Sequence, residues 1–262
     1  MKTNILLLAI VITALACEAP KDSQMAETIE SNPAVDGFNT SGSDSIAVAW
    51  ADACMKAMGG RQSWDQLNVV AWNFFGARDL IWEKSTGRVR IDFPRDSSIY
   101  LVNINTMEGK VWRKGEEVTQ ADSLKKYLNR AKSIWINDSY WLVMPFKLKD
   151  TGVTLNYLRS DTTLNGVTAE VLQLTFENVG DTPQNKYEVF IDVADSLVKQ
   201  WSYFRQAEQD SASAIWPWDN YQSYNGLLLS ANRSDNRGPK NLRVYDEVSD
   251  AVFESFEVPE LE

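Results

Sequence analysis

The chain has 262 residues, of which 44% are hydrophobic and 24% charged, an ordinary balance for a globular protein. Its formal net charge of -10 argues against nucleic acid as a partner. It contains no histidine, which excludes Ser-His-Asp and Cys-His nucleophilic sites and zinc sites built on imidazole.

Neither a metal nor a cofactor is predicted. The two cysteines are too few for a cysteine-only zinc site, and no Gly-rich phosphate-binding loop is present. The 36 acidic residues leave room for a catalytic carboxylate pair, but no spacing singles one pair out.

Residues 1–16 have the pattern of a secretory signal peptide. Lys2 supplies a positive start, and Ile5 to Ala16 is an apolar run too short to span a bilayer. The small residues before Cys17 resemble a bacterial lipobox, although Leu15 lies two residues before the cysteine, where the pattern prefers three. We predict lipidation of Cys17, which would attach the chain to a membrane; the alternative is an ordinary signal peptide with a chance cysteine.

Residues 17–45 are predicted to form a disordered, lipid-anchored linker. Six acidic residues and one basic residue lie between Glu18 and Ser45, and large apolar side chains are few. The like charges repel one another, and the segment has too few apolar groups to form a packed core. An acidic stretch after a lipidated cysteine also resembles the surface-export tags of some Gram-negative lipoproteins. We prefer a plain spacer.

The first helix is predicted from Ile46 to Met58, with Asp44 or Ser45 as its N-cap and Gly59-Gly60 ending it. Cys54 lies on this helix and is predicted to be a buried free thiol, since Cys17 is assigned to lipidation.

Strands are predicted between Trp64 and Phe93 and again at Ile99–Ile104 and Lys110–Arg113, because apolar residues alternate there between turn signals. A second helix is predicted from Thr119 or Asp122 to about Trp135, with Leu124, Leu128 and Ala131 in its apolar stripe.

An aromatic cluster between residues 135 and 146 is the best candidate for a ligand wall, and it comprises Trp135, Tyr140, Trp141 and Phe146. We prefer the alternative that these residues form a core strand after the helix, because aromatic clusters belong more often to the hydrophobic core than to a binding site. The segment Trp216-Pro217-Trp218 is predicted to be a loop that either covers a sheet edge or lies at a cavity mouth.

Residues 153–159 are predicted to be a short strand, and residues 167–204 an antiparallel meander with strands at 167–176, 187–192 and 197–204. Tyr187 and Val189 belong to one apolar face. The opposite face also carries apolar bulk, to which we assign Val171, Phe190, Leu197, Trp201 and Tyr203. A sheet that is apolar on both faces is covered on both or lines a cavity, so Trp201 is a further candidate ligand residue.

The final strands are predicted within Asn220–Asn232 and at Asn241–Tyr245 and Val252–Phe256. No boundary is evident after residue 46, so residues 46–262 are predicted to form one β-rich α+β domain.

This order of elements resembles the LolA/LolB-type lipoprotein carrier superfamily. The resemblance includes the lipobox, the helix ending in Gly-Gly, the consecutive strands and mid-chain helix, and the late segments 187–192, 197–201 and 220–229. It implies an incomplete antiparallel β-barrel, or half-barrel, with helices packed in or over its concave face, and a hollow for acyl chains. The chain looks closer to uncharacterised envelope lipoproteins of this fold than to the carriers, and no lipid-binding residue of the carriers is matched.

We therefore expect a non-catalytic lipoprotein of the outer membrane, facing the periplasm or the cell surface. It would bind a lipid, another apolar small molecule or a lipidated protein in its hollow, through the aromatic residues named above and Trp216 and Trp218. Two alternatives remain open: a scaffold or assembly lipoprotein whose own helices fill the hollow, and an envelope hydrolase that uses a carboxylate pair.

Overall fold

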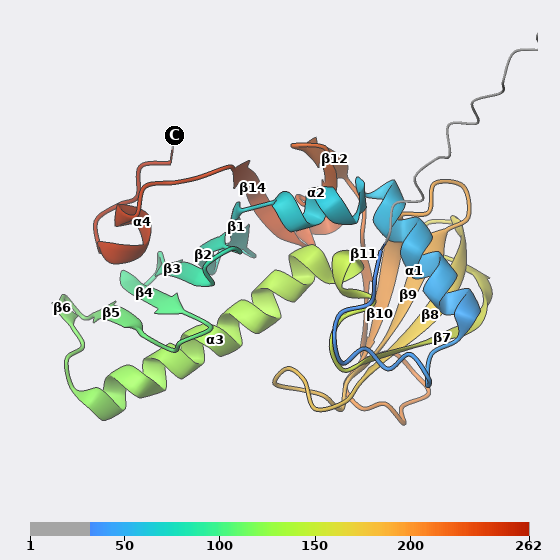
Figure 1. Ribbon diagram of the computed structural model, residues 1–262, viewed down its shortest axis with the longest axis horizontal. Helices are drawn as coiled ribbons and strands as arrows, with labels where there is room; N and C mark the ends of the chain where they lie inside the picture. Colours follow the sequence, from blue (N-terminus) through green and yellow to red (C-terminus); the bar gives the residue numbers. More distant parts are fainter. Residues whose placement is uncertain (1–31, 262) are drawn as a thin grey trace, which may run out of the picture.

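The computed structural model describes residues 32–261, which form two open antiparallel sheets with helices packed against them (Figure 1). The predicted signal peptide, Cys17 and the linker up to residue 31 lie outside the described residues. None of the helices between residues 32 and 261 is both long enough and apolar enough to cross a bilayer.

The first sheet, sheet A, has seven strands in the order β14-β1-β2-β3-β4-β5-β6. Its strands are β1 (Val69–Phe74), β2 (Arg78–Glu83), β3 (Arg88–Phe93), β4 (Ser98–Asn103), β5 (Gly109–Arg113), β6 (Glu116–Glu117) and β14 (Pro239–Tyr245). All of its pairs are antiparallel, and β14 joins the sheet beside β1, far from it in sequence.

The second sheet, sheet B, has five strands in the order β11-β10-β9-β8-β7. They are β7 (Val153–Thr162), β8 (Thr168–Phe176), β9 (Lys186–Asp192), β10 (Val198–Phe204) and β11 (Ala214–Pro217). A separate hairpin consists of β12 (Tyr221–Tyr224) and β13 (Leu227–Ser230).

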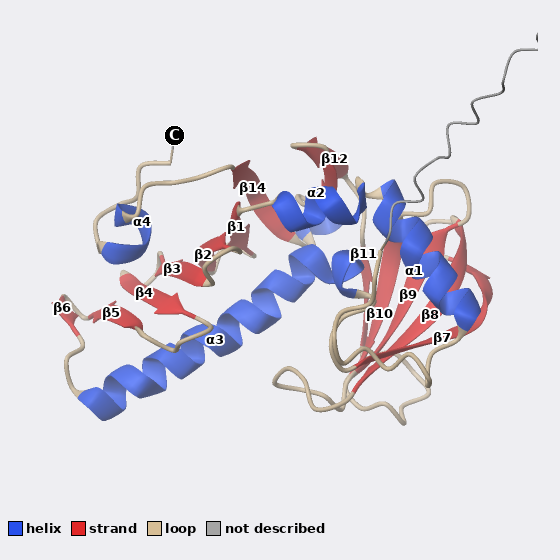
Figure 2. Cartoon of the chain, in the orientation of Figure 1, coloured by secondary structure: helices blue, strands red, loops and turns tan. Residues whose placement is uncertain are grey.

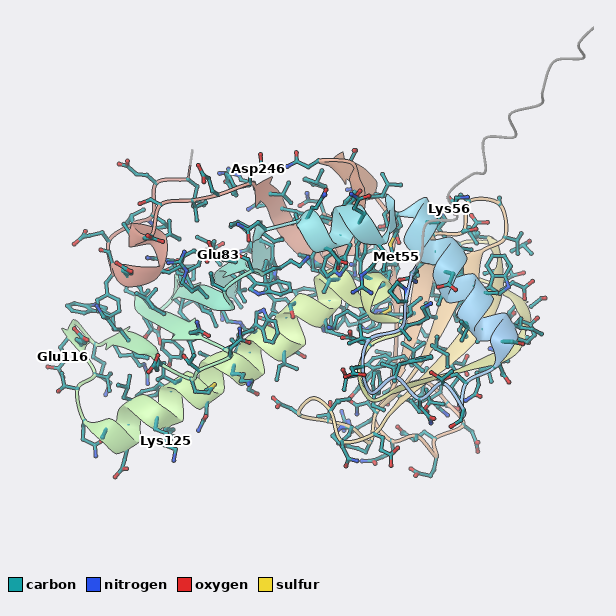
Figure 3. All side chains as sticks on the ribbon, in the orientation of Figure 1. Met55, Lys56, Glu83, Glu116, Lys125 and Asp246 are labelled. Carbon is teal, nitrogen blue, oxygen red and sulfur yellow. The ribbon has the colours of Figure 1, made fainter. Side chains whose placement is uncertain are left out.

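The helices are α1 (Ser45–Ala57), α2 (Gly60–Gln66), α3 (Ala121–Val143), α4 (Ala251–Glu254) and the short 3-10 helices η1 (Met144–Lys147) and η2 (Ser234–Asn236). Helix α1 packs beside β7, whereas α3 runs along sheet A and ends next to sheet B (Figure 2). Charged side chains such as Glu116 and Lys125 lie at the end of the molecule farthest from sheet B (Figure 3).

The predicted fold class, an open antiparallel β structure with helices, is confirmed. The strands are divided between two main sheets, however, and one hydrophobic core draws on both of them together with α1 and α3. The prediction that Cys54 is a buried free thiol is also confirmed, and burial raises the pKa of this thiol to about 12.

Several element predictions were wrong. Helix α3 continues to Val143, so the residues after Trp135 are helical and not a strand. Gly60 begins α2, and Trp64 lies in that helix. Residues 251–254 form α4 in place of a strand, and β11 includes Trp216 and Pro217, which were predicted to be in a loop.

The predicted disorder of the linker is wrong for residues 35–44. The backbone N–H groups of Val35, Asn39 and Asp44 donate to the carbonyls of Lys149, Val153 and Leu155 at 2.9–3.0 Å, and Phe38 is buried in the core. The composition of the segment concealed one buried aromatic residue, and the edge strand β7 offers backbone partners that composition does not reveal.

Trp201 and Tyr203 lie on the core face of sheet B, not on the opposite face as predicted. Trp201 is opposite Val189, and Tyr203 is opposite Tyr187. The register of β10 against β9 shifts between Val198 and Gln200, and this irregularity moves the later residues to the other face. The outer face of sheet B keeps a small apolar cluster of Ala169, Val171 and Phe190.

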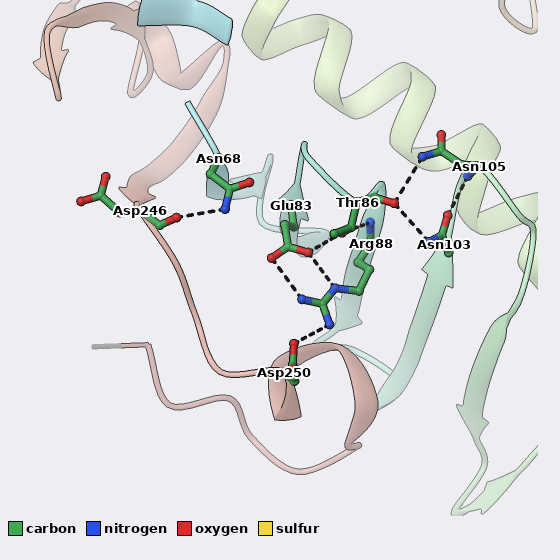
Figure 4. Close-up of polar contacts among 8 residues, drawn as sticks. All are labelled: Asn68, Glu83, Thr86, Arg88, Asn103, Asn105, Asp246 and Asp250. Atoms are coloured by element: carbon green, nitrogen blue, oxygen red, sulfur yellow. Dashed lines mark hydrogen bonds and ion pairs between the residues drawn. The ribbon is translucent and has the colours of Figure 1, made fainter. Parts of the chain in front are cut away.

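The C-terminal segment covers the outer face of sheet A. Val252 and Phe253 pack against Val69, Ala71 and Ile81. The buried guanidinium of Arg90 donates to the carbonyls of Val252, Ser255 and Glu257 at 2.8–3.1 Å. Arg88 joins Glu83 to Asp250 at the start of α4 (Figure 4). Strand β1 is therefore apolar on both faces because both are covered.

A buried ion pair fixes α3 against sheet A. Arg78 on β2 contacts Asp138 on α3 through two hydrogen bonds of 2.8 and 2.9 Å, and the Asp138 side chain is fully buried. Asn137 donates a further bond of 2.9 Å to the same carboxylate. Burial raises the pKa of Asp138, and the Arg78 guanidinium opposes that rise. The pair sets the position of the half of α3 that approaches sheet B.

We expect Arg78→Met to lower the free energy of unfolding by about 3 kcal/mol, because it leaves a buried carboxylate without its cation. The matched control is Arg159→Met, since Arg159 pairs with the carboxylates of Asp161 and Glu188 but is 44% exposed, and it should cost less than about 1 kcal/mol. Urea denaturation measures both. Equal losses would show that the Arg78–Asp138 pair has no special structural role.

Candidate functional site

A cavity of about 580 Å³ lies between the C-terminal half of α3, the segment from η1 to the start of β7, and the loop between β8 and β9. Its volume is within the range of about 300–1,000 Å³ that is usual for small-molecule sites. Its wall includes Trp82, Trp135, Ile136, Tyr140, Trp141, Val143, Val153, Phe176, Val179 and Tyr187.

In this wall, aromatic side chains from both sheets contact aromatic side chains of α3. Trp82 of sheet A contacts Trp135 edge-on, with ring centroids 5.2 Å apart. Tyr140 contacts Tyr187 and Phe176 of sheet B, at 5.6 and 6.2 Å. Aromatic rings provide a large apolar area with few rotatable bonds, so the wall is suited to an apolar ligand.

Polar residues complete the lining. Lys147 forms an ion pair with Asp150, and the Ser133 hydroxyl donates a hydrogen bond to Asp181 in the β8–β9 loop. The Ser133–Asp181 bond ties that loop to α3. The cavity thus joins an apolar wall to a charged segment, an arrangement suited to a ligand with an apolar body and a polar end.

Three buried hydrogen-bond donors in the wall residues have no partner among the described residues: Nε1 of Trp82, Nε1 of Trp135 and the hydroxyl of Tyr140. Buried Trp and Tyr donors usually find a partner. Burial is the main cause that raises the pKa of Tyr140 well above its ordinary value, so the phenol keeps its proton at neutral pH.

The predicted ligand residues divide into two groups. Trp135, Tyr140 and Trp141 line the cavity. Phe146 instead stacks on Trp64, with ring centroids 4.5 Å apart. Trp201 and Trp218 are each 1% exposed in the core, and Trp216 packs edge-on against Trp141 at 5.0 Å.

Trp141 connects the cavity to the junction of the two sheets. Its indole contacts Trp201 of sheet B at 4.8 Å and Phe75 of the β1–β2 turn at 5.4 Å. Phe75 has a φ of 52°, a left-handed conformation that is uncommon for a bulky residue. The turn thereby places an aromatic ring from sheet A among the tryptophans that border sheet B.

A buried arginine supports this junction. Arg233 packs over Trp218, with its guanidinium carbon 3.5 Å from the ring centroid, and donates to the Trp141 carbonyl in the last turn of α3 at 2.7 Å. Burial lowers the pKa of Arg233 to about 9, so it stays charged at neutral pH, and the negative end of the α3 dipole favours that charge.

The sequence prediction missed Trp82, Phe176, Tyr187 and the β8–β9 loop as parts of the cavity wall. Phe176 and Tyr187 stand at the two ends of that loop, and their position beside the aromatic segment of α3 depends on tertiary packing. Among residues 32–261, no group of three or more acidic, cysteine or histidine side chains is arranged to hold a metal ion.

No model of a protein family matches the chain, and no curated protein matches it either. Among solved structures, the chain is similar to a DUF1329 family protein from Desulfovibrio piger, with 13% identity and a TM-score of 0.43 over 80% of this chain and 97% of that one.

It is also similar to a putative outer membrane lipoprotein-sorting protein domain from Vibrio parahaemolyticus, with 11% identity and a TM-score of 0.38 over 78% of this chain and 97% of the other. A LolA superfamily protein from Nitrosomonas europaea gives 8% identity and a TM-score of 0.34 over 77% and 97%. These findings agree with the resemblance noted in the sequence.

Core and wall tryptophans should respond differently to truncation. We expect Trp201→Ala to lower the free energy of unfolding by about 3–5 kcal/mol, because a fully buried ring is replaced by a void. Trp135→Ala should cost clearly less, since Trp135 is only partly buried and borders space that already exists. Chemical denaturation of both variants tests this, and an equal or larger cost for Trp135 would place that ring in the core.

Proposed function

We propose that this protein binds the apolar part of a lipid, or of a similar elongated ligand, in the cavity beside α3. The observation that carries the proposal is the aromatic wall, to which both sheets and α3 contribute. Moving an acyl chain from water into such a cavity contributes about 0.8 kcal/mol for each buried methylene group. The bound molecule would be a lipid, another apolar small molecule or the acyl group of a lipidated protein.

The cavity favours ligand binding over a scaffold role with a self-filled hollow. Helix α3 occupies much of the space between the sheets, but it forms one wall of the cavity and does not fill it. A non-catalytic role fits the lining carboxylates, because Asp150 is engaged by Lys147 and Asp181 by Ser133. We propose binding, with transfer of lipid or lipoprotein as the process it would serve.

We further propose that the protein acts in the cell envelope as a lipoprotein anchored through Cys17. Support comes from the sequence, in which a short apolar run ends in small residues before this cysteine. The lipid anchor would hold the cavity close to the outer membrane, facing either the periplasm or the cell surface.

Filling the cavity should abolish binding. The full chain should bind the lauroyl dye laurdan near one to one, and Val179→Trp should remove this binding because an indole from the β8–β9 loop would occupy the cavity. Fluorescence titration measures the effect. Val193→Trp is the matched control, because Val193 is exposed and does not line the cavity. Undiminished binding to a folded Val179→Trp variant would contradict the proposed site.

Lipidation is tested separately. Cells that express the chain in the presence of a labelled fatty acid should incorporate the label into the protein, and Cys17→Ser should abolish incorporation, because the thiol is the proposed acceptor. Cys54→Ser is the control, since Cys54 is buried and should not be modified. Equal labelling of the Cys17→Ser variant would overturn the anchor.

A further inference from the structure

A cluster of positive charge lies on α3 next to the cavity. Residues 125–132 include four cations and no carboxylate, although the whole chain has a net charge of -10; the cations are Lys125, Lys126, Arg130 and Lys132. Lys125, Lys126 and Arg130 are exposed. Among residues 32–261, none of these three side chains has an ion-pair or hydrogen-bond partner. Their charges are therefore available to a ligand.

Two of these cations continue the side of α3 that lines the cavity. Lys126, Arg130, Ser133 and Asn137 follow one another at intervals of four, three and four residues, so they share one side of the helix. Ser133 and Asn137 line the cavity. With a rise of about 1.5 Å per residue, Arg130 precedes Ser133 by about 4.5 Å along the helix axis, and Lys126 precedes it by about 10 Å. Sheet A covers the opposite side of this part of α3 (Figure 1).

The cavity meets solvent beside these two cations, which we call the basic pair. Asn137 of α3 and Gly180 and Asp181 of the β8–β9 loop line the cavity and are exposed. Ser133 joins the two sides of this opening, since its hydroxyl donates a hydrogen bond to Asp181. A ligand whose chain occupies the cavity would therefore leave its polar end at the opening, next to Arg130.

The balance of charge at the opening is positive on the α3 side. Two carboxylates lie near the basic pair, Asp122 one turn before Lys126 and Asp181 at the opening, and the four cations of α3 outnumber them. Lys147, which also lines the cavity, is already paired with Asp150. The unpaired positive charge near the cavity thus belongs to the exposed side of α3.

The basic pair is suited to an anion. Lys126 and Arg130 are four residues apart, and like charges at that spacing destabilise a helix. An anion beside both would offset this repulsion. A guanidinium also binds phosphate or carboxylate oxygens through parallel N–H groups, which gives stronger hydrogen bonds than neutral partners do.

On the basis of the proposed function, we infer that the ligand is an anionic amphiphile. Its acyl chain lies in the cavity, and its phosphate or carboxylate head group lies at the opening on Lys126 and Arg130. The charged group stays at an exposed surface in this arrangement and avoids the cost of burying a charge, whereas the apolar wall receives only the chain. An anionic lipid and an acylated acidic peptide both present this chemistry.

Two ligands that differ only in a phosphate test the inference: glycerol monolaurate and 1-lauroylglycerol 3-phosphate. Each displaces laurdan from the full chain in dilute buffer, at concentrations below those at which micelles form. We expect 1-lauroylglycerol 3-phosphate to bind about tenfold more tightly, because two exposed ion pairs, each of modest strength, add to the same acyl chain. This preference should decrease as sodium chloride screens the charges.

Three double variants locate the head group. Lys126→Gln/Arg130→Gln should bind the two ligands about equally, because the acyl chain remains and the cations are removed. Lys126→Glu/Arg130→Glu should reverse the preference, because like charges repel. Lys56→Gln/Arg243→Gln is the matched control. It removes two exposed cations that do not line the cavity, so the net charge changes equally and the tenfold preference should persist.

The outcomes separate the two levels of the proposal. If neither laurdan nor the two lauroyl ligands bind, the proposed function itself is wrong. If laurdan and glycerol monolaurate bind but the phosphate adds no affinity, or if the control variant loses the preference as fully as Lys126→Gln/Arg130→Gln does, the head-group site is overturned and the cavity alone remains. An N-lauroyl acidic dipeptide, titrated in parallel, distinguishes an acylated peptide from a lipid as the source of the anion.

Discussion

The structure depends on the packing of Trp141 at the junction of the two sheets. Its ring lies against Phe74 and Phe75 from sheet A and against Trp201 and Trp216 from sheet B. Its carbonyl accepts a hydrogen bond from buried Arg233. A single helix can pack against both sheets only if its end is held in place, and these contacts fix the C-terminal end of α3. Because the same helix forms one wall of the cavity, the junction also determines the shape of the site.

The cavity follows from this shared use of α3. The Arg78–Asp138 pair holds the helix against sheet A, and the aromatic cluster holds it against sheet B. Close to these two attachments, Trp135 and Tyr140 border space that neither sheet fills. The β8–β9 loop then closes one side through the bond between Ser133 and Asp181. An ion pair holds the helix to sheet A and apolar burial holds it to sheet B, and the space beside the helix remains available to a ligand.

Local pattern was sufficient to predict much of the fold. The alternating residues of β8 and β9, the stripe of α1 and the turn residues between strands predicted those elements within a few residues. The C-terminal half of α3 could not be predicted in the same way, because tryptophan and tyrosine have little helix preference and the segment looked like a buried strand. Its helical state is set by packing against both sheets.

The site was predictable only in part, for related reasons. Trp135, Tyr140 and Trp141 were predicted from the aromatic cluster at residues 135–146 and line the cavity, whereas Phe146 of the same cluster belongs to the core. Trp201 and Trp218, which were chosen on other grounds, also belong to the core. The register shift in β10 decided the side on which Trp201 lies, and a pattern of period two contains no signal for it. Phe176 and Tyr187 line the cavity because tertiary packing brings the ends of β8 and β9 beside α3, and no local sequence pattern indicates this.

We propose that the cavity between α3 and sheet B receives an apolar chain. A crystal structure of the full chain with a bromine-labelled lauroyl ester tests it most directly, because bromine is located by its anomalous scattering. We expect one bromine site between Trp135, Tyr140 and Phe176, which line the cavity. Bromine found only on the outer surface, with the cavity occupied by the protein's own side chains, would contradict it.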